Sequence, residues 1–217
     1  MVSCNYKENG MKKYLLLLAA GSIVCCAYVE DSPLIAAVRK RDELAVAKAI
    51  SDGADVNERV GAHFSDGGCP VLHYAIACGP REIVRKLIEA GADVNAFSEG
   101  KFCHIRGRLD ERYIPLLSYA IKSERSIGII EELINAGADV NKRDLHGTWT
   151  PSMIAAYVGY MDAFNKLLTA GADQSLKNPL DGGRKAIDYA YEQGHDDIIE
   201  LCRKAKPRKS CWSCFGR

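Results

Sequence analysis

The sequence has almost no net charge and contains few of the patterns that carry catalysis. Its 217 residues include 29 lysines and arginines and 28 aspartates and glutamates, for a formal net charge of +1 at pH 7. This balance supplies no global field for a nucleic acid, so we expect no nucleic-acid partner. The sequence also lacks a glycine-rich phosphate loop, a Gly-x-Ser-x-Gly motif and a convincing acid–base pair. We therefore expect a protein that is not an enzyme and holds no cofactor.

The cysteines and histidines do not gather into a metal site or a disulfide framework. The chain has nine cysteines, and most are scattered, as is typical of small buried apolar residues. Cys103 and His104 form one adjacent pair, while Cys211 and Cys214 form a Cys-x-x-Cys that is half of a zinc knuckle. A structural zinc site needs about four clustered ligands, so we expect no bound metal.

Residues 1–29 have the layout of a secretory signal. Lys12 and Lys13 precede an apolar run over residues 14–29, in the order that a signal peptide requires. The run is shorter than the roughly 20 apolar residues of a membrane-spanning helix. Two small residues near the end of this run, Cys25 and Ala27, allow cleavage after Ala27. Tyr28 would then be the new N-terminus.

Other interpretations of this N-terminal segment stay open. Cys25 or Cys26 could carry a lipid, although neither follows the glycine, alanine or serine that this motif prefers. The apolar run could instead be retained as a membrane anchor, and Met11 could be the natural start. We expect an exported protein, periplasmic or secreted, with anchoring by the N-terminal segment as the alternative.

One phrase occurs four times along the rest of the chain. It reads "SDGADVN" at Ser51, "EAGADVN" at Glu89, "NAGADVN" at Asn135 and "TAGADQS" at Thr169. The glycines are 38, 46 and 34 residues apart, which fits a 33-residue period with insertions. Each phrase follows an alanine-rich segment, such as "TPSMIA", and then an amphipathic stretch, such as "AFNKLL". The repeating unit is therefore a helix, a turn, a second helix and a loop.

These units resemble the ankyrin-repeat family, whose pattern is Thr-Pro-Leu-His-x-Ala, a short turn, a second helix and Gly-Ala-Asp-Val-Asn. The resemblance covers about residues 31–204. It implies an all-α solenoid of about five helix-turn-helix units with long β-turn or loop fingers. We expect repeats at 31–58, 66–96, 111–142 and 146–176, a C-terminal capping repeat at 181–205, and a basic, cysteine-containing tail at 206–217.

The repeated residues also have physical roles of their own. The hydroxyl residues of "SPLIAA" and "TPSMIA" can cap a helix, and the following proline suits the first helical position. Glycine after the second helix allows a left-handed stop, and the aspartate and asparagine can bond the turn backbone. We expect the paired apolar residues at the end of each second helix to be buried between neighbouring units: Leu87 and Ile88, Leu133 and Ile134, and Leu167 and Leu168. His73 stands in the family's histidine position, and we predict a hydrogen bond at the helix start.

Two loops are longer than the repeat requires. Residues 58–70 carry about five extra residues, and residues 96–115 carry about twelve. The second loop mixes cationic and aromatic side chains, which can contact anionic or aromatic groups of a partner. The alternative is that this loop is a solvent-exposed insertion with no role in binding. The candidate partner-binding residues of this loop are Phe102, His104, Arg106, Arg108 and Arg112.

The resemblance implies further partner-facing positions, just before the helix-capping threonine and in the turn between the two helices of a unit. In this sequence these positions are Lys122, Leu145, His146, Trp149 and Tyr157. Trp149 is the sharpest candidate, because a tryptophan in a loop has no evident core role, although it could cover the neighbouring loop.

We thus expect a monomeric, protein-binding repeat module that displays its loop tips and a concave helix face to an unidentified protein. We expect contact with a membrane only through residues 1–29, and only if they are not cleaved. The alternative is an enzyme or redox accessory that uses the His104 loop or the pair Cys211 and Cys214.

Overall fold

The computed structural model describes residues 17–19, 22–24, 32–60, 68–97 and 114–204. The chain divides into two units, Met1–Asp31 and Ser32–Arg217. In the first unit, strand β1 (Leu17–Ala19) pairs antiparallel with β2 (Ser22–Val24). Within the described segments, no helix combines the length and the apolar character that a bilayer crossing demands. The cleavage and anchoring of residues 1–29 stay predictions.

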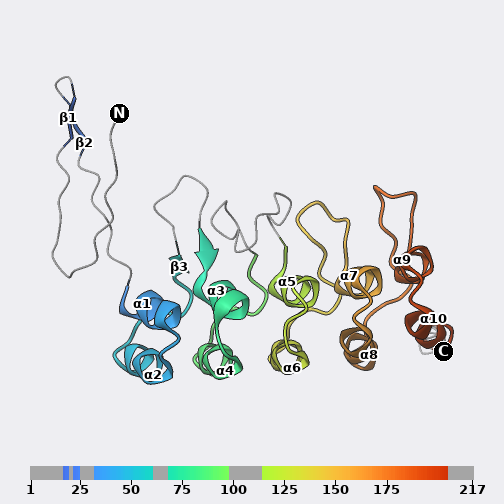
Figure 1. Ribbon diagram of the computed structural model, residues 1–217, viewed down its shortest axis with the longest axis horizontal. Helices are drawn as coiled ribbons and strands as arrows, with labels where there is room; N and C mark the ends of the chain where they lie inside the picture. Colours follow the sequence, from blue (N-terminus) through green and yellow to red (C-terminus); the bar gives the residue numbers. More distant parts are fainter. Residues whose placement is uncertain (1–16, 20–21, 25–31, 61–67, 98–113, 205–217) are drawn as a thin grey trace, which may run out of the picture. The chain divides into compact units, whose positions relative to one another are not determined.

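The described residues of the second unit form five consecutive helix pairs. They are α1 (Pro33–Lys40) with α2 (Glu43–Ser51), α3 (Val71–Cys78) with α4 (Arg81–Glu89), α5 (Leu116–Lys122) with α6 (Ile127–Asn135), α7 (Pro151–Val158) with α8 (Met161–Thr169), and α9 (Ala186–Gln193) with α10 (Asp196–Lys204). The odd-numbered helices, called the inner helices, form one row, and the even-numbered outer helices form a second (Figure 1). The predicted all-α solenoid is confirmed.

Four segments, called fingers 1 to 4, connect each outer helix to the next inner helix. They comprise residues 58–70, 96–115, 142–150 and 176–185, and Figure 1 shows fingers 3 and 4 projecting beyond the row of inner helices. At the base of finger 1, β3 (Arg59–Val60) pairs antiparallel with β4 (Cys69–Pro70). Phe97 and Pro115 form an isolated antiparallel bridge at the base of finger 2.

Local residue chemistry sets the ends of the helices. The Ser32 hydroxyl accepts a hydrogen bond from the Ile35 amide (3.1 Å), and the Thr150 hydroxyl accepts one from the Met153 amide (3.3 Å). Both predicted caps are confirmed. After the outer helices α2, α4, α6 and α8, the glycine of the repeated phrase is left-handed, as at Gly91 with φ +91°, where a side chain would be strained.

The core runs without a break from the first helix pair to the last. On the outer helices, Leu87, Leu133 and Leu167 are fully buried, as predicted. Their predicted partners Ile88, Ile134 and Leu168 are only half-buried and pack against the edge of this core. The alanines at one repeated position of the inner helices, such as Ala75 and Ala155, are also fully buried, because a methyl side chain lets adjacent helices approach closely. Each unit thus completes its core with its neighbours.

A ladder of asparagine side chains joins the units at the bases of the fingers. An asparagine oxygen accepts a hydrogen bond from the aspartate amide of the next repeat at 2.8 Å in three places: Asn57 from Asp93, Asn95 from Asp139, and Asn141 from Asp173. Within each phrase the aspartate carboxylate accepts the amide two residues later, again at 2.8 Å. The predicted turn bonds are confirmed, and the same asparagines also bond between repeats.

A second set of contacts links the short turns between inner and outer helices. The Arg125 guanidinium donates to the Gly79 carbonyl (3.1 Å), and the Tyr160 hydroxyl donates to the Arg125 carbonyl (2.9 Å). Between the fourth and fifth pairs, the ring of His195 lies so close to Gly159, at the end of α7, that a Cβ added to this glycine would collide with it. These contacts join the second to fifth units at the turns, whereas the asparagine ladder joins the first to fourth units at the bases of the fingers.

The predicted helix-start hydrogen bond of His73 is wrong. Its side chain is buried against Tyr119, with ring centroids 4.0 Å apart, and neither ring nitrogen has a hydrogen-bond partner among the described residues. The capping position of α3 is Pro70, which offers no hydroxyl group. The next inner helix repeats the situation, because Pro115 is its cap and the buried Ser118 hydroxyl also finds no partner in the described segments.

Loss of one ladder asparagine should destabilise the whole array. Asn95 accepts from the Asp139 amide and donates to the Gly137 carbonyl (3.2 Å), and each such bond contributes about 0.5–1.5 kcal/mol net. We expect Asn95→Ala to lower the free energy of unfolding by about 1–2 kcal/mol in urea titrations followed by circular dichroism. The control is Asn135→Ala, at the exposed end of α6, which should change stability by less than about 0.5 kcal/mol. Equal losses in the two variants would contradict the role of the ladder.

Candidate functional site

The tip of finger 3 is a hydrogen-bonded turn. The Asp144 carbonyl accepts from the Gly147 amide (2.9 Å), and the Asp144 carboxylate accepts from the Thr148 amide (2.6 Å) and hydroxyl. Leu145 and His146 occupy the two central positions of this turn and are exposed. Because the turn is closed by its own backbone, these two side chains point from a fixed support.

Basic side chains tie finger 3 to both of its neighbours. The Arg143 guanidinium donates to the Gly147 carbonyl (2.8 Å) and, across to finger 4, to the Lys177 carbonyl (2.9 Å). On the other side, the Lys142 ammonium donates to the Asn95 carbonyl (2.6 Å) and lies 4.3 Å from the centre of the Phe97 ring. The fingers therefore keep a defined spacing.

Three aromatic rings lie together where fingers 3 and 4 meet the inner helices. The Trp149 ring centroid is 4.5 Å from that of Tyr189 on α9 and 5.6 Å from that of Tyr157 on α7. Trp149 is half-buried and Tyr189 is fully buried, whereas 47% of Tyr157 is exposed. Trp149 thus packs against the next repeat while remaining partly exposed, and Tyr157 presents the larger aromatic surface to solvent.

The Tyr189 hydroxyl organises finger 4. It donates to the Asp181 carboxylate (2.8 Å) and accepts from the Asn178 side-chain amide (2.9 Å). Asn178 in turn accepts the Leu180 amide on its side-chain oxygen (3.1 Å). Burial and the bond to Asp181 raise the pKa of Tyr189 to about 12. Leu180, held at the tip of this loop, is 78% exposed.

The structure separates the predicted partner-facing residues into groups. Leu145 and His146 share one finger tip, Trp149 and Tyr157 are in contact, and Lys122 lies half-buried at the end of α5, one unit earlier. The candidates in the second long loop, Phe102, His104, Arg106, Arg108 and Arg112, lie outside the described residues, as do Cys211 and Cys214.

Sequence reasoning overlooked finger 4. Leu180 lies in "NPLDGG", where Asn-Pro and Asp-Gly pairs mark a tight loop, so the exposed tip was detectable from the sequence. The role of Tyr189 was not, because it depends on a ring contact with a residue 40 positions earlier, Trp149.

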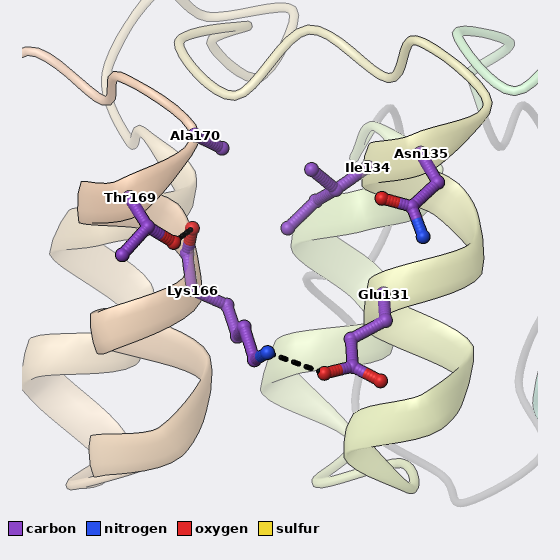
Figure 2. Close-up of a pocket in the computed structure, with 6 residues that line it drawn as sticks. All are labelled: Glu131, Ile134, Asn135, Lys166, Thr169 and Ala170. Carbon is purple, nitrogen blue, oxygen red and sulfur yellow. Dashed lines mark hydrogen bonds and ion pairs between the residues drawn. The ribbon is translucent and has the colours of Figure 1, made fainter.

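A small pocket of about 300 Å³ opens on the side of the outer helices, between α6 and α8. Figure 2 shows Lys166 reaching from α8 to Glu131 on α6, where the ammonium and carboxylate are 2.6 Å apart. This hydrogen-bonded lysine lowers the pKa of the Glu131 carboxyl. The two charged groups of the pocket are bound to each other, so they form an ion pair between two helices and do not resemble an acid–base site.

Comparison with known proteins gives consistent results. A family model described as ankyrin repeats (3 copies) matches residues 1–98 and 117–210. "Cyclin-dependent kinase 4 inhibitor B" of Mus musculus is 35% identical over 141 residues, which cover 65% of this chain and 94% of that protein. The Homo sapiens protein of that name is 31% identical over 148 residues, or 68% and 96%. "Ankyrin repeat protein nuc-2" of Neurospora crassa is 29% identical over 140 residues, which cover 64% of this chain and 12% of that protein.

The hydroxyl of Tyr189 gives a pH-dependent prediction. The folded protein holds this proton more tightly than the unfolded chain, because the pKa rises from 10.0 to about 12 on folding. The corresponding stability is present below pH 10.0 and is lost as the pH rises towards about 12. We expect Tyr189→Phe to be less stable at pH 8, by about 1–2 kcal/mol, and to lose less stability than the wild type when the pH is then raised.

The matched control for this titration is Tyr157→Phe, which keeps the exposed ring and removes only its hydroxyl. In urea unfolding at a series of pH values, the free energy of unfolding of this variant should change with pH as it does in the wild type. A Tyr189→Phe variant with an unchanged slope would show that the hydroxyl is not bound as described.

Proposed function

The chain belongs to the ankyrin-repeat family, and from that premise we propose that it binds a partner protein through its fingers and the exposed side of its inner helices. The observation that carries this proposal is the continuous core, which leaves the finger tips as supported but unburied side chains. Binding by rigid display loses little conformational entropy, because the side chains are already ordered before the partner arrives.

We assign the binding face to Lys122, Leu145, His146, Trp149 and Tyr157, together with Phe102, His104, Arg106, Arg108 and Arg112 of the long second finger. Lys122 and Tyr157 occupy the same position on neighbouring inner helices, two residues after the buried alanines Ala120 and Ala155. Equivalent positions on stacked helices lie side by side, so a single partner surface can contact both.

A protein kinase is one candidate for the partner. Two of the relatives carry the name of an inhibitor of cyclin-dependent kinase 4, and the similarity spans nearly their whole length. Inhibition by such a module requires occupation of a surface on the kinase and no chemistry of its own. We propose binding and not catalysis or redox chemistry; the residues of that alternative, His104, Cys211 and Cys214, lie outside the described residues.

The proposed face can be tested by placing glutamate on the inner helices and, as a control, on an outer helix. Lys122→Glu combined with Tyr157→Glu should lower the affinity for a partner at least tenfold, because a charge then meets a surface shaped for the opposite sign or for an apolar contact. Arg85→Glu on the outer helix α4, where the arginine side chain is 51% exposed, should leave the affinity unchanged. The measurement is retention of proteins on the immobilised full chain, followed by calorimetry with the purified partner, starting with cyclin-dependent kinase 4.

Both variants should first match the wild type in helix content and in thermal unfolding. If binding survives the inner-face substitutions and is lost with Arg85→Glu, the partner occupies the outer helices and the proposed face is wrong.

We further propose that residues 1–29 direct export of the chain, or else anchor it in a membrane. The support is in the sequence alone: Lys12 and Lys13, the apolar run over residues 14–29 and the small residue Ala27. Cleavage would leave the repeats intact, since the first helix begins only at Pro33.

N-terminal sequencing of the protein expressed with residues 1–29 distinguishes these fates. Export with cleavage should give a mature chain that begins at Tyr28, and Ala27→Leu should block the processing, because signal peptidase needs a small residue there. An unprocessed chain in the membrane fraction would favour the anchor, and an unprocessed chain in the cytosol would contradict both.

A further inference from the structure

We propose that fingers 3 and 4 bind a negatively charged, extended segment of the partner that carries apolar side chains between its acidic residues. The contact surface, called the tip surface, consists of Leu145, Leu180 and Tyr157 with the basic residues of the two fingers. This inference rests on the proposed function and narrows it to one end of the array and one chemical class of partner.

Exposed apolar side chains are concentrated at the C-terminal end of the array. The large hydrophobic residues that are exposed in the described segments are Leu44, Leu145, Tyr157, Met161, Leu180 and Tyr191. Five of these six lie between residues 145 and 191. Leu145 and Leu180 occupy the tips of neighbouring fingers, at 59% and 78% exposure. Leucines in such positions contribute nothing to the core, whereas a partner can bury them.

The two leucines are held in place by the loops that carry them. The Asp144–Gly147 turn supports Leu145, and the side chain of Asn178 accepts the amide of Leu180. The Arg143 guanidinium joins the two fingers through the Lys177 carbonyl. Since the distance between the tips is fixed in advance, an extended segment can contact both with little loss of entropy.

The charge on this side of the molecule selects an acidic segment. The inner helices and the described parts of the fingers carry nine basic residues: Arg39, Lys40, Arg59, Lys122, Lys142, Arg143, Lys177, Arg184 and Lys185. They carry five acidic residues: Glu58, Asp144, Asp181, Asp188 and Glu192. Five of the nine basic residues, but only two of the acidic ones, belong to fingers 3 and 4.

Each of the five acidic side chains is already engaged inside the protein. Glu58 accepts from the Ser32 hydroxyl, Asp144 from Thr148, Asp181 from Tyr189, Asp188 from the Lys185 amide, and Glu192 from Arg184. Arg184 is paired with Asp181 and Glu192, and the excess of basic over acidic residues in fingers 3 and 4 remains, which favours negative charge on the bound segment.

The tip surface suits a protein segment better than a nucleic acid. Binding of single-stranded nucleic acid relies on aromatic faces on which bases can stack, but the Trp149 ring is packed against Tyr189 and Tyr157. The most exposed side chains are aliphatic leucines, which pack against leucine, isoleucine or phenylalanine. Within the tip surface as defined, the exposed aromatic ring is that of Tyr157.

The test uses a library of random 12-residue peptides displayed on phage and selected on the immobilised full chain. We expect the enriched peptides to combine aspartate or glutamate with leucine or phenylalanine, and to bind at least tenfold more weakly at 0.5 M salt than at 0.05 M. Leu145→Ser combined with Leu180→Ser should weaken the enriched peptides at least tenfold. The matched control is Leu44→Ser on α2, where the leucine is 82% exposed and lies off the tip surface, and it should bind like the wild type.

Three results would overturn the inference: enrichment of basic or purely polar peptides, no enrichment at all, or equal binding by the Leu145/Leu180 variant and the Leu44 variant. Displacement of the selected peptides by a 20-nucleotide oligothymidylate at micromolar concentration would also overturn it, since the surface would then accept a nucleic acid. If a purified partner is lost with the Lys122 and Tyr157 substitutions but not with those at Leu145 and Leu180, the proposed function stands and only this inference fails.

Discussion

The hydrogen bond from an aspartate amide to the asparagine of the preceding repeat joins the bases of successive fingers in this protein. It spans from Asn57 to Asp93, from Asn95 to Asp139 and from Asn141 to Asp173 at the same 2.8 Å. The hydrophobic core between helices is non-directional and would tolerate small rotations of one unit against the next. A directional bond at the base of each finger removes that freedom, so the surface above it has one geometry.

Much of the fold could be predicted because each repeated residue has a local reason to be there. The glycines end outer helices in the left-handed conformation, Ser32 and Thr150 cap inner helices, and the buried leucines recur with the period of the repeat. These features depend on residues close in sequence. The bond between His73 and a helix start was predicted wrongly because it needed a hydroxyl at position 70, where the chain has proline.

The candidate site was less accessible to sequence reasoning, because its members come from different repeats. Tyr157 and Leu145 were assigned by position, and the structure places both on exposed surface. Trp149 was assigned as a partner-facing candidate with cover of the neighbouring loop as the alternative, and the structure packs its ring on Tyr189 of the next repeat. Leu180 and the link from Arg143 to finger 4 became evident only from the contacts between neighbouring loops.

The proline caps at Pro70 and Pro115 have a consequence for how the array opens. They leave the buried polar groups of His73 and Ser118 without partners in the described structure, on two adjacent inner helices. Each such group costs about 1–3 kcal/mol, and the cost falls on the middle of the array and not on its ends. In a linear array, stability is a sum of local terms, so we expect partial unfolding to start at the centre. The two ends would then separate as folded halves, in contrast to the fraying from the termini that is usual for helical chains.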